Sequence, residues 1–245
     1  MRSAHFLFVV LVVCACGSDK SQFGSDASAN DAGTDGTTIG DGGNPFSDSS
    51  IPDGGGSPDG KPSPVNLIPN GDFEQGNTSF GSDYAYAATT NTVEGQYTVG
   101  KNAQTWNGAL VSAGDHTSGS SLMFIGNGKA TPDRVWFTAT IAVQQNTSYY
   151  FEAFVQNLCC TPQSGLGDGV NPVGPSVLSF YANGQLLGTR TSSKIGVWEG
   201  LTTSWDSGSA TTVDLKLVNS NTDALGNDFA VDDVYLGTVS TVLPN

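Results

Sequence analysis

The chain has 245 residues, with 23 acidic side chains against 9 basic ones, a formal net charge of −14 and a pI near 4.1. This excess of negative charge argues against nucleic acid or anionic lipid as a partner, because both require clustered cations. When an apolar leader and a polar spacer are set aside, roughly 180 residues remain, which is enough for one domain with a single core.

Residues 1–16 are typical of an export signal. Their apolar core, Phe6–Val13, is about half as long as a membrane-spanning helix, so a transmembrane segment is not expected. The end of the segment, Val13-Cys14-Ala15-Cys16-Gly17, resembles the lipobox of bacterial lipoproteins, with the cut before Cys16. The alternative is an ordinary secretory signal that is cut near the same residue.

Lipid chains on Cys16 would attach the protein to a membrane without a spanning helix. The resemblance therefore implies an exported protein that is lipid-anchored to the cell envelope, with its domain in the periplasm or at the cell surface. Gly17 after the cysteine resembles lipoproteins that are sent to an outer membrane, which favours that membrane. The anchor is the only membrane contact that we expect.

Residues 17–64 are built mainly from Gly, Ser, Asp, Thr and Ala, with few large apolar side chains. Such a segment cannot bury enough apolar surface to offset the entropy of ordering it. We therefore expect a disordered linker that holds the domain away from the membrane. Its Asp-Gly pairs lack the regular repeat of calcium-binding loops.

Residues 65–238 alternate apolar and polar side chains at strand spacing, and no stretch has a convincing helical pattern. Asn183-Gly184, between two such runs, is typical of a β-hairpin. Nine or ten short strands, roughly, predict an all-β sandwich, and pairing of the first strand with the last favours a jelly roll. Residues 239–245 form a C-terminal tail. The expected strands lie at Tyr97–Val99, Ser121–Ile125, Val135–Val143, Tyr149–Gln156, Val177–Ala182, Gln185–Leu187, Trp198–Trp205, Thr212–Val218 and Phe229–Leu236.

Two stretches bracket this domain. Asn66–Gly76 contains a short apolar run that enters a Pro-Asn-Gly turn and continues as Asp-Phe-Glu, and Asn227–Leu236 is a closing strand that contains Asp-Asp-Val. They resemble the N-terminal "NGDFE" and C-terminal "DDV" signatures of jelly-roll carbohydrate-binding modules of families four, nine and twenty-two, which are galactose-binding-like in fold. The resemblance extends over residues 65–238.

In those modules a structural calcium ion lies between the opening turn, a nearby loop and the closing strand. The resemblance therefore implies that carboxylates at these three places bind Ca²⁺. Alternation puts Asp232 on the side of Ala230 and Val234, so we expect it to face inward, where a carboxylate is costly unless it is paired or binds a metal. The alternative is that these are turn residues and charges at a sheet edge. The implied ligands are Asp72, Glu74, Asp115, Asp232 and Asp233.

Cys159 and Cys160 are the only cysteines that follow the leader. Adjacent cysteines in an exported protein can form a disulfide with each other. Two free thiols, or a bridge to another chain, are the alternatives. A metal site made from this pair alone would lack its other ligands.

The same resemblance implies glycan binding, in which sugar rings stack on aromatic side chains and sugar hydroxyls bond amides and carboxylates. Alternation places Trp136 opposite the apolar row of its own strand. By the same alternation Tyr150, Glu152, Phe154 and Gln156 share one face, and Ser179 and Tyr181 share another. Adjacent rows would form a concave binding surface. If the loop Cys159–Pro175 covered that surface, a structural role for the domain would be favoured over sugar binding. Trp198 and Trp205 are interpreted as packing residues. The candidate ligand-binding residues are Trp136, Tyr181, Trp106, Asn107, Tyr150, Gln156 and Glu152.

Catalysis fits the sequence poorly. His116 is the only histidine after the leader, and no nucleophile or phosphate-binding motif accompanies it. A glycosidase pair such as Glu152 with Glu94 remains open. We expect a non-catalytic, monomeric module that binds a polysaccharide or glycoconjugate. The alternatives are a structural or adhesive surface protein that binds other proteins, and a small glycoside hydrolase.

Overall fold

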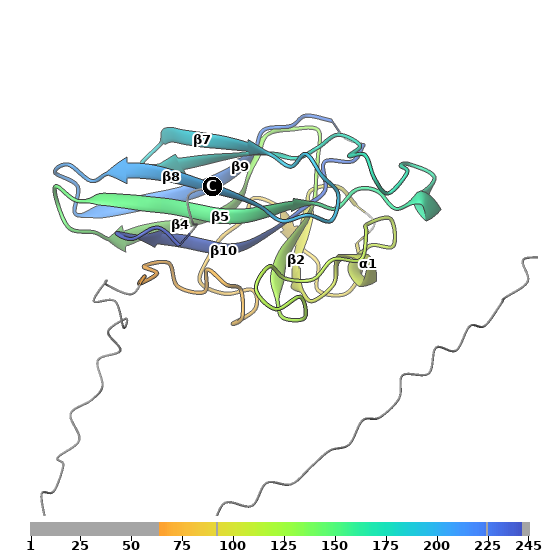
Figure 1. Cartoon of the computed structure of the whole chain (residues 1–245), viewed down its shortest axis with the longest axis horizontal. Helices are drawn as coiled ribbons and strands as arrows, with labels where there is room; N and C mark the ends of the chain where they lie inside the picture. Colours follow the sequence, from red (N-terminus) through yellow and green to blue (C-terminus); the bar gives the residue numbers. More distant parts are fainter. Residues whose placement is uncertain (1–63, 92, 224, 242–245) are drawn as a thin grey trace, which may run out of the picture. The chain divides into compact units, whose positions relative to one another are not determined.

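The computed structural model describes residues 64–91, 93–223 and 225–241 (Figure 1). The predicted signal at residues 1–16, the predicted linker up to residue 63 and residues 242–245 of the predicted tail lie outside the described residues. In the described part, no helix is long and apolar enough to cross a membrane.

Two sheets pack face to face and form the predicted all-β jelly-roll sandwich. The six-stranded sheet contains, in spatial order, β1 (Ala85–Tyr86), β2 (Gln96–Gly100), β3 (Met123–Asn127), β10 (Phe229–Gly237), β5 (Ser148–Asn157) and β8 (Glu199–Asp206). The four-stranded sheet contains β4 (Asp133–Ala142), β9 (Thr212–Asn219), β6 (Val177–Ala182) and β7 (Gln185–Thr191). Apart from the parallel pair β1–β2, the paired strands are antiparallel.

Strict alternation along β5 explains how the core forms. Its odd-numbered residues from Tyr149 to Val155 are buried between the sheets, where Phe151 lies 5.2 Å from Phe180 of the opposite sheet, measured between ring centroids. Full burial of each large apolar side chain contributes about 1.5–3 kcal/mol. The even-numbered residues of β5 therefore lie on the other side, which we call the outer face of the six-stranded sheet.

A second, smaller apolar cluster covers one part of the outer face. The connection between β2 and β3 contains a single helical turn, α1 (Ala103–Trp106), whose cap Asn102 accepts hydrogen bonds from two backbone N–H groups. One turn is too short to produce a periodic pattern, so no helix was expected here. The cluster leaves uncovered the part of the outer face over the first half of β5. Its members are Ala103, Trp106, Leu110, Ala113, Met123, Ile125, Leu158 and Ala230.

The opening segment, residues 66–76, lies against β10, as the sequence predicted, although it forms turns instead of a strand. Leu67 donates its N–H to Leu236 (2.8 Å), and Val234 donates its N–H to Gly71 (2.8 Å). The side-chain amide of Asn66 adds two further hydrogen bonds to β10: it donates to the Val234 carbonyl (2.8 Å) and accepts from the Leu236 N–H (3.0 Å). These contacts fix the position of the opening turn relative to the closing strand.

We predict that Gly71→Ala weakens this attachment. A Cβ at this position would lie 2.0 Å from the Val234 carbonyl oxygen and 2.8 Å from Asn66 Nδ2, so the segment would have to move away from β10. The expected cost is about 1–3 kcal/mol of unfolding free energy, typical of overpacking. Urea denaturation measures it. Gly108→Ala is the control, because a Cβ there meets nothing within 4 Å. Equal stability of the two variants would contradict the prediction.

Candidate functional site

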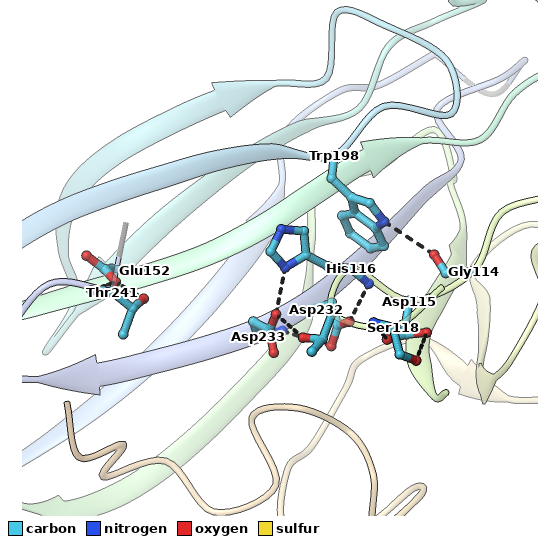
Figure 2. A network of polar contacts seen from close by, with 10 residues as sticks. Gly114, Asp115, His116, Ser118, Glu152, Trp198, Asp232, Asp233 and Thr241 are labelled. Atoms are coloured by element: carbon cyan, nitrogen blue, oxygen red, sulfur yellow. Dashed lines mark hydrogen bonds and ion pairs between the residues drawn. The ribbon is translucent and has the colours of Figure 1, made fainter. Parts of the chain in front are cut away.

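An acidic pocket lies where the opening segment, the loop 114–121 and β10 meet. Its volume is about 390 Å³. All five carboxylates that the resemblance implied as calcium ligands line it: Asp72, Glu74, Asp115, Asp232 and Asp233. Figure 2 shows three of them, Asp115, Asp232 and Asp233, next to one another at the edge of β10.

A bulge in β10 brings two of these carboxylates to the same side. The pairing of β10 with β5 shifts between Asp232 and Tyr235, and Asp233 has a left-handed backbone with φ of 48°. The expectation that Asp232 faces inward with Val234 is therefore wrong. Val234 points into the core, whereas Asp232 lies on the outer face, where it is buried beneath the loop 114–121. Alternation fails here because the bulge adds one residue to the strand.

The two buried carboxylates of the pocket have opposite electrostatic environments. Burial raises the pKa of Asp232 to about 8; the N–H of His116, 2.8 Å from its Oδ2, opposes the increase, and the nearby charges of Asp233 and Asp115 add to it. Burial also raises the pKa of Asp115. There, however, the donors of Ser118 and Ser121 outweigh burial, so that the pKa lies below its usual value. Asp115 is thus stabilised as an anion, and Asp232 is not.

The pocket has the oxygen ligands that a hard divalent cation prefers. In the described ranges, none of the five carboxylates forms an ion pair with Lys or Arg; Asp233 Oδ2 lies 2.7 Å from Nδ1 of His116. No three of the five bring ligand atoms within 4.8 Å of one another. As they stand, at most two of these carboxylates could therefore ligate the same ion, and backbone carbonyls or water would have to supply the other ligands.

A groove of about 470 Å³ adjoins the acidic pocket and shares Asp72 and Asp233 with it. The His116 ring stacks on Phe154 of β5, with centroids 3.5 Å apart, and it meets the Trp198 ring at an interplanar angle of 74°, with centroids 5.8 Å apart. His116 and Asp233 each keep 29% of their side-chain surface exposed, so a ligand can reach both. The remaining lining is Asn66, Ile68, Asn70, Gly71, Gln75, Tyr235 and Thr241.

The sequence indicated only part of this groove. Alternation placed Phe154 on the correct face, but His116 was considered only as a poor candidate for a catalytic base. The amides of Asn66, Asn70 and Gln75 were missed, because the opening motif was interpreted for its carboxylates alone. The resemblance that put this segment beside β10 was the signal that could have found them.

Trp136 does not lie on a binding surface, so that prediction is wrong. It is 1% exposed and packs in the core, 6.4 Å from Phe151 between ring centroids. The pairing of β4 with β9 skips one residue between Arg134 and Trp136. This bulge reverses the alternation that the prediction followed, so that Val135 and Trp136 are both buried.

The predicted surface also combined residues of different sheets. Tyr150 and Gln156 lie on β5 in the six-stranded sheet, whereas Tyr181 lies on β6 in the other sheet, where the Lys216 ammonium is 4.7 Å from its ring centroid. Gln156 is buried, and its Oε1 has no hydrogen-bond partner. The four residues proposed together, including Trp136, therefore form no common face.

The other aromatic predictions divide between the two apolar clusters. Trp106 is buried at the end of α1 and donates its Nε1–H to the Ala87 carbonyl (2.8 Å), while Asn107 donates to Asn91 (2.8 Å). Both hold loops together and lie outside the groove. Trp205 packs in the core as expected. Trp198 also packs, but against the smaller apolar cluster, and it lies beside His116.

Glu152 and Glu94 are not arranged as a glycosidase pair. Glu94 directly precedes β2, and Glu152 lies on β5, so that β3 and β10 separate the two strands. Glu152 is fully buried and hydrogen-bonded to residues that follow β10.

Cys159 and Cys160 are joined by a disulfide next to the buried carboxyl of Asp228. These three residues are the only group in the described ranges with His, Cys, Asp or Glu ligand atoms mutually within 4.8 Å. The bonded sulfurs offer no thiolate, so the oxidised pair is not a metal site. Burial raises the pKa of Asp228 to about 7, although the Gly128 N–H donates to it (3.0 Å).

No family model and no curated protein matches the sequence. Among solved structures, the chain is similar to a cyclase from Fischerella sp. TAU, with a TM-score of 0.48 and 14% identity over 73% of this chain and 100% of that one. It is also similar to a family 16 carbohydrate-binding module (TM-score 0.43, 16% identity, 70% and 99%) and to the C-terminal domain of the sugar-binding protein EclA (0.34, 14%, 42% and 66%). At these values the likenesses assign neither ligand nor activity.

The buried carboxyl of Asp228 is expected to make stability depend on pH. Its pKa is about 7 when folded and near 3.8 when unfolded, so the folded state retains a proton that the unfolded state loses as pH rises from 4 to 7. Unfolding free energy therefore falls across this window, at about 1.4 kcal/mol per unit of pKa difference.

Asp228→Asn should remove this fall, because the amide remains neutral and still accepts from Gly128. The variant should match the original chain at pH 4 and exceed it by a few kcal/mol at pH 8. Denaturant titrations at both pH values measure the difference, with exposed Asp223→Asn as the control. A constant difference between Asp228→Asn and the original chain at both pH values would show that the carboxyl does not titrate in this way.

Proposed function

We propose that this chain is a non-catalytic module that binds glycans through the groove on the outer face of its six-stranded sheet. The similar structures include both sugar-binding proteins and cyclases, so the proposal rests on the site itself. The observation that carries it is the combination, in one groove, of stacked rings and accessible polar groups: His116 on Phe154, beside Asp233 and Gln75.

These groups match the two needs of sugar recognition. A flat ring of His or Phe can pack on the apolar face of a pyranose, and the Gln75 amide and the neighbouring carboxylates can bond its hydroxyls. The amides of Asn66 and Asn70 instead hold the opening segment in place. Such contacts with a sugar are individually weak, which favours a ligand with repeated units.

Binding without catalysis is the second part of the proposal. His116 is the only histidine in the described ranges, and its Nδ1 bonds Asp233. The hydroxyl of Thr117 donates to the same carboxylate (2.9 Å). Because it bonds Asp233 and not His116, it is not positioned as a nucleophile that His116 could activate. Glu152 and Glu94 lie on separate strands, which also argues against a glycosidase.

We further propose that a calcium ion occupies the acidic pocket as a structural element. The carboxyl of Asp232 is buried without a Lys or Arg partner in the described residues, and a cation would stabilise its charged form. The carboxylates that line the pocket, Asp72 and Glu74 from the opening turn together with Asp115, Asp232 and Asp233, are the candidate ligands, and three or more of them would have to move closer together to bind the ion directly. The ion would thereby join the opening segment, the loop 114–121 and β10, which form two walls of the groove.

The proposal includes display on a membrane through a lipid at Cys16, with the chain acting as a monomer. This part rests on the lipobox-like sequence of residues 13–17, which lies outside the described residues. A lipid anchor together with an acidic linker would present the groove to polysaccharides of the cell envelope or its surroundings.

The glycan proposal predicts that Phe154→Ala and His116→Ala each weaken binding. Loss of one stacked ring should cost about 1–3 kcal/mol, or roughly ten- to a hundredfold in affinity. The full chain and both variants would be screened on insoluble and soluble polysaccharides by pull-down and affinity electrophoresis. Tyr181→Ala is the matched control, because this tyrosine is partly exposed on the four-stranded sheet.

A loss of retention in Tyr181→Ala alone would move the site to the other sheet. If the folded chain is retained on no glycan, the proposed function is wrong, and an adhesive surface that binds protein becomes the better account.

The calcium proposal predicts that Ca²⁺ stabilises the chain and that Asp232→Asn abolishes the effect. At Ca²⁺ of about 100 times the dissociation constant, binding adds about 2.7 kcal/mol, or roughly 5–10 °C in Tm for a domain of this size. Thermal unfolding with Ca²⁺, with Mg²⁺ and with chelator measures it, and Asp223→Asn is the control. An equal Ca²⁺ response in both variants would rule out Asp232 as a ligand.

A further inference from the structure

The chain that follows β10 folds back onto the outer face of the sheet that β10 belongs to. Tyr235 donates its hydroxyl to the Val239 carbonyl (2.6 Å), which holds the segment close to the strand. Residues Ser240 and Thr241 then reach Glu152 of the neighbouring strand β5. Figure 2 shows Glu152 and Thr241 in contact on this face, nearer than His116 to the start of β5 and the end of β10.

Glu152 is fully buried, yet in the described residues no Lys or Arg pairs with it. Its Oε1 accepts from the Ser240 hydroxyl, and its Oε2 accepts from the Thr241 N–H (2.9 Å) and hydroxyl (2.5 Å). Three hydrogen-bond donors therefore satisfy both oxygens of one carboxylate. Without them, burial of a charged carboxylate on this face would be costly.

The position of Glu152 is that of a surface residue. It pairs across the strands with Tyr235 of β10 and with Thr202 of β8, which is exposed, and it shares the outer face with Tyr150 and Phe154. Its burial comes from the returning segment, because the sheet itself leaves this face open. Burial and the charge of Glu152 raise the pKa of the neighbouring Tyr235, which stays a neutral hydroxyl donor.

The contacts to Glu152 have the chemistry of a bound sugar. Two hydroxyls that donate to the two oxygens of one carboxylate reproduce the contact that adjacent hydroxyls of a pyranose make with Asp or Glu. Thr241 also lines the groove that contains His116 and Phe154. The segment 239–241 is therefore the end wall of the groove, and Glu152 lies directly behind that wall.

We propose that Glu152 is a sugar-binding residue and that Ser240 and Thr241 occupy its site as an internal mimic of adjacent sugar hydroxyls. The proposal rests on the glycan-binding function proposed above and extends it. A saccharide with two neighbouring free hydroxyls displaces segment 239–241, bonds Glu152 and lengthens the groove along β5. The site thus binds more units of a polysaccharide than the closed groove admits, and the segment lowers the apparent affinity of every saccharide that needs Glu152.

This competition has a quantitative consequence. If the segment covers Glu152 for nine-tenths of the time, the apparent affinity of a saccharide that needs Glu152 falls about tenfold. Variants that release the segment should recover this factor. The first variant ends the chain after Thr238. The second keeps the whole chain but removes both hydroxyls, Ser240→Ala with Thr241→Val.

Affinity electrophoresis of the full chain and both variants on soluble xylan, mannan and laminarin tests the proposal. We expect both variants to bind at least one of these polysaccharides about tenfold more tightly than the full chain. Glu152→Gln, added to the double variant, should remove the gain. The matched control, Ser209→Ala with Thr212→Val, removes the same two kinds of hydroxyl group from exposed residues outside this face. It should bind like the full chain.

The outcomes separate the two proposals. If the full chain binds and release of the segment leaves its affinity unchanged or lower, the tail has only a structural role, while the glycan-binding function stands. The same conclusion follows if the gain survives Glu152→Gln. If none of the folded proteins binds any of the three polysaccharides, both proposals are overturned. In a bound complex, the Thr241 amide should also exchange its hydrogen faster than in the free protein.

Discussion

The attachment of the opening segment to β10 is the constraint on which the site depends. Three backbone and side-chain connections make it: the pairing of Leu67 with Leu236, the pairing of Gly71 with Val234, and the Asn66 amide that bonds both strand residues. Because the segment belongs to neither sheet, these hydrogen bonds largely determine where its turn lies. The turn then presents Asp72 and Glu74 to the carboxylates of β10, and its amides to the groove.

The bulge at Asp233 is the second element that this arrangement needs. In a regular strand, Asp232 and Asp233 would point to opposite faces of the sheet, and one carboxylate would enter the apolar core. The left-handed backbone at Asp233 lets both line one pocket, with Val234 returned to the core. The extra residue thus places two neighbouring carboxylates in one pocket, where their negative charges would repel each other. Hydrogen-bond donors such as the His116 N–H, or a bound cation, are needed to stabilise this arrangement.

The sequence predicted the elements of this fold well because most of its strands are regular. The alternation along β5 and the Asn183-Gly184 turn between β6 and β7 follow local rules that need no tertiary information. The five carboxylates that line the acidic pocket were also predicted to lie together, because the resemblance places the opening motif beside the closing strand. Composition alone could not have shown that these two distant stretches are neighbours.

The errors arose where local rules stop. Trp136 was assigned to a surface because a bulge between Arg134 and Trp136 cannot be seen in the sequence, and one extra residue exchanges the two faces. Tyr181 was combined with Tyr150 because alternation says which residues share a face but not which sheet a strand joins. The return of the tail onto Glu152 could not be predicted either, since polar side chains such as Ser240 have no pattern that indicates a partner.

The outer face of the six-stranded sheet is therefore covered at both ends, by the cluster around α1 and by residues 239–241, and the groove lies between them beside the acidic pocket. The central claim is that one ion in that pocket holds the opening segment and the loop 114–121 against β10. Amide hydrogen exchange with and without Ca²⁺ tests it most directly. The account predicts that residues 66–76 and 114–121 gain protection together when Ca²⁺ is added. Unchanged exchange, or protection of only one of the two segments, would contradict it.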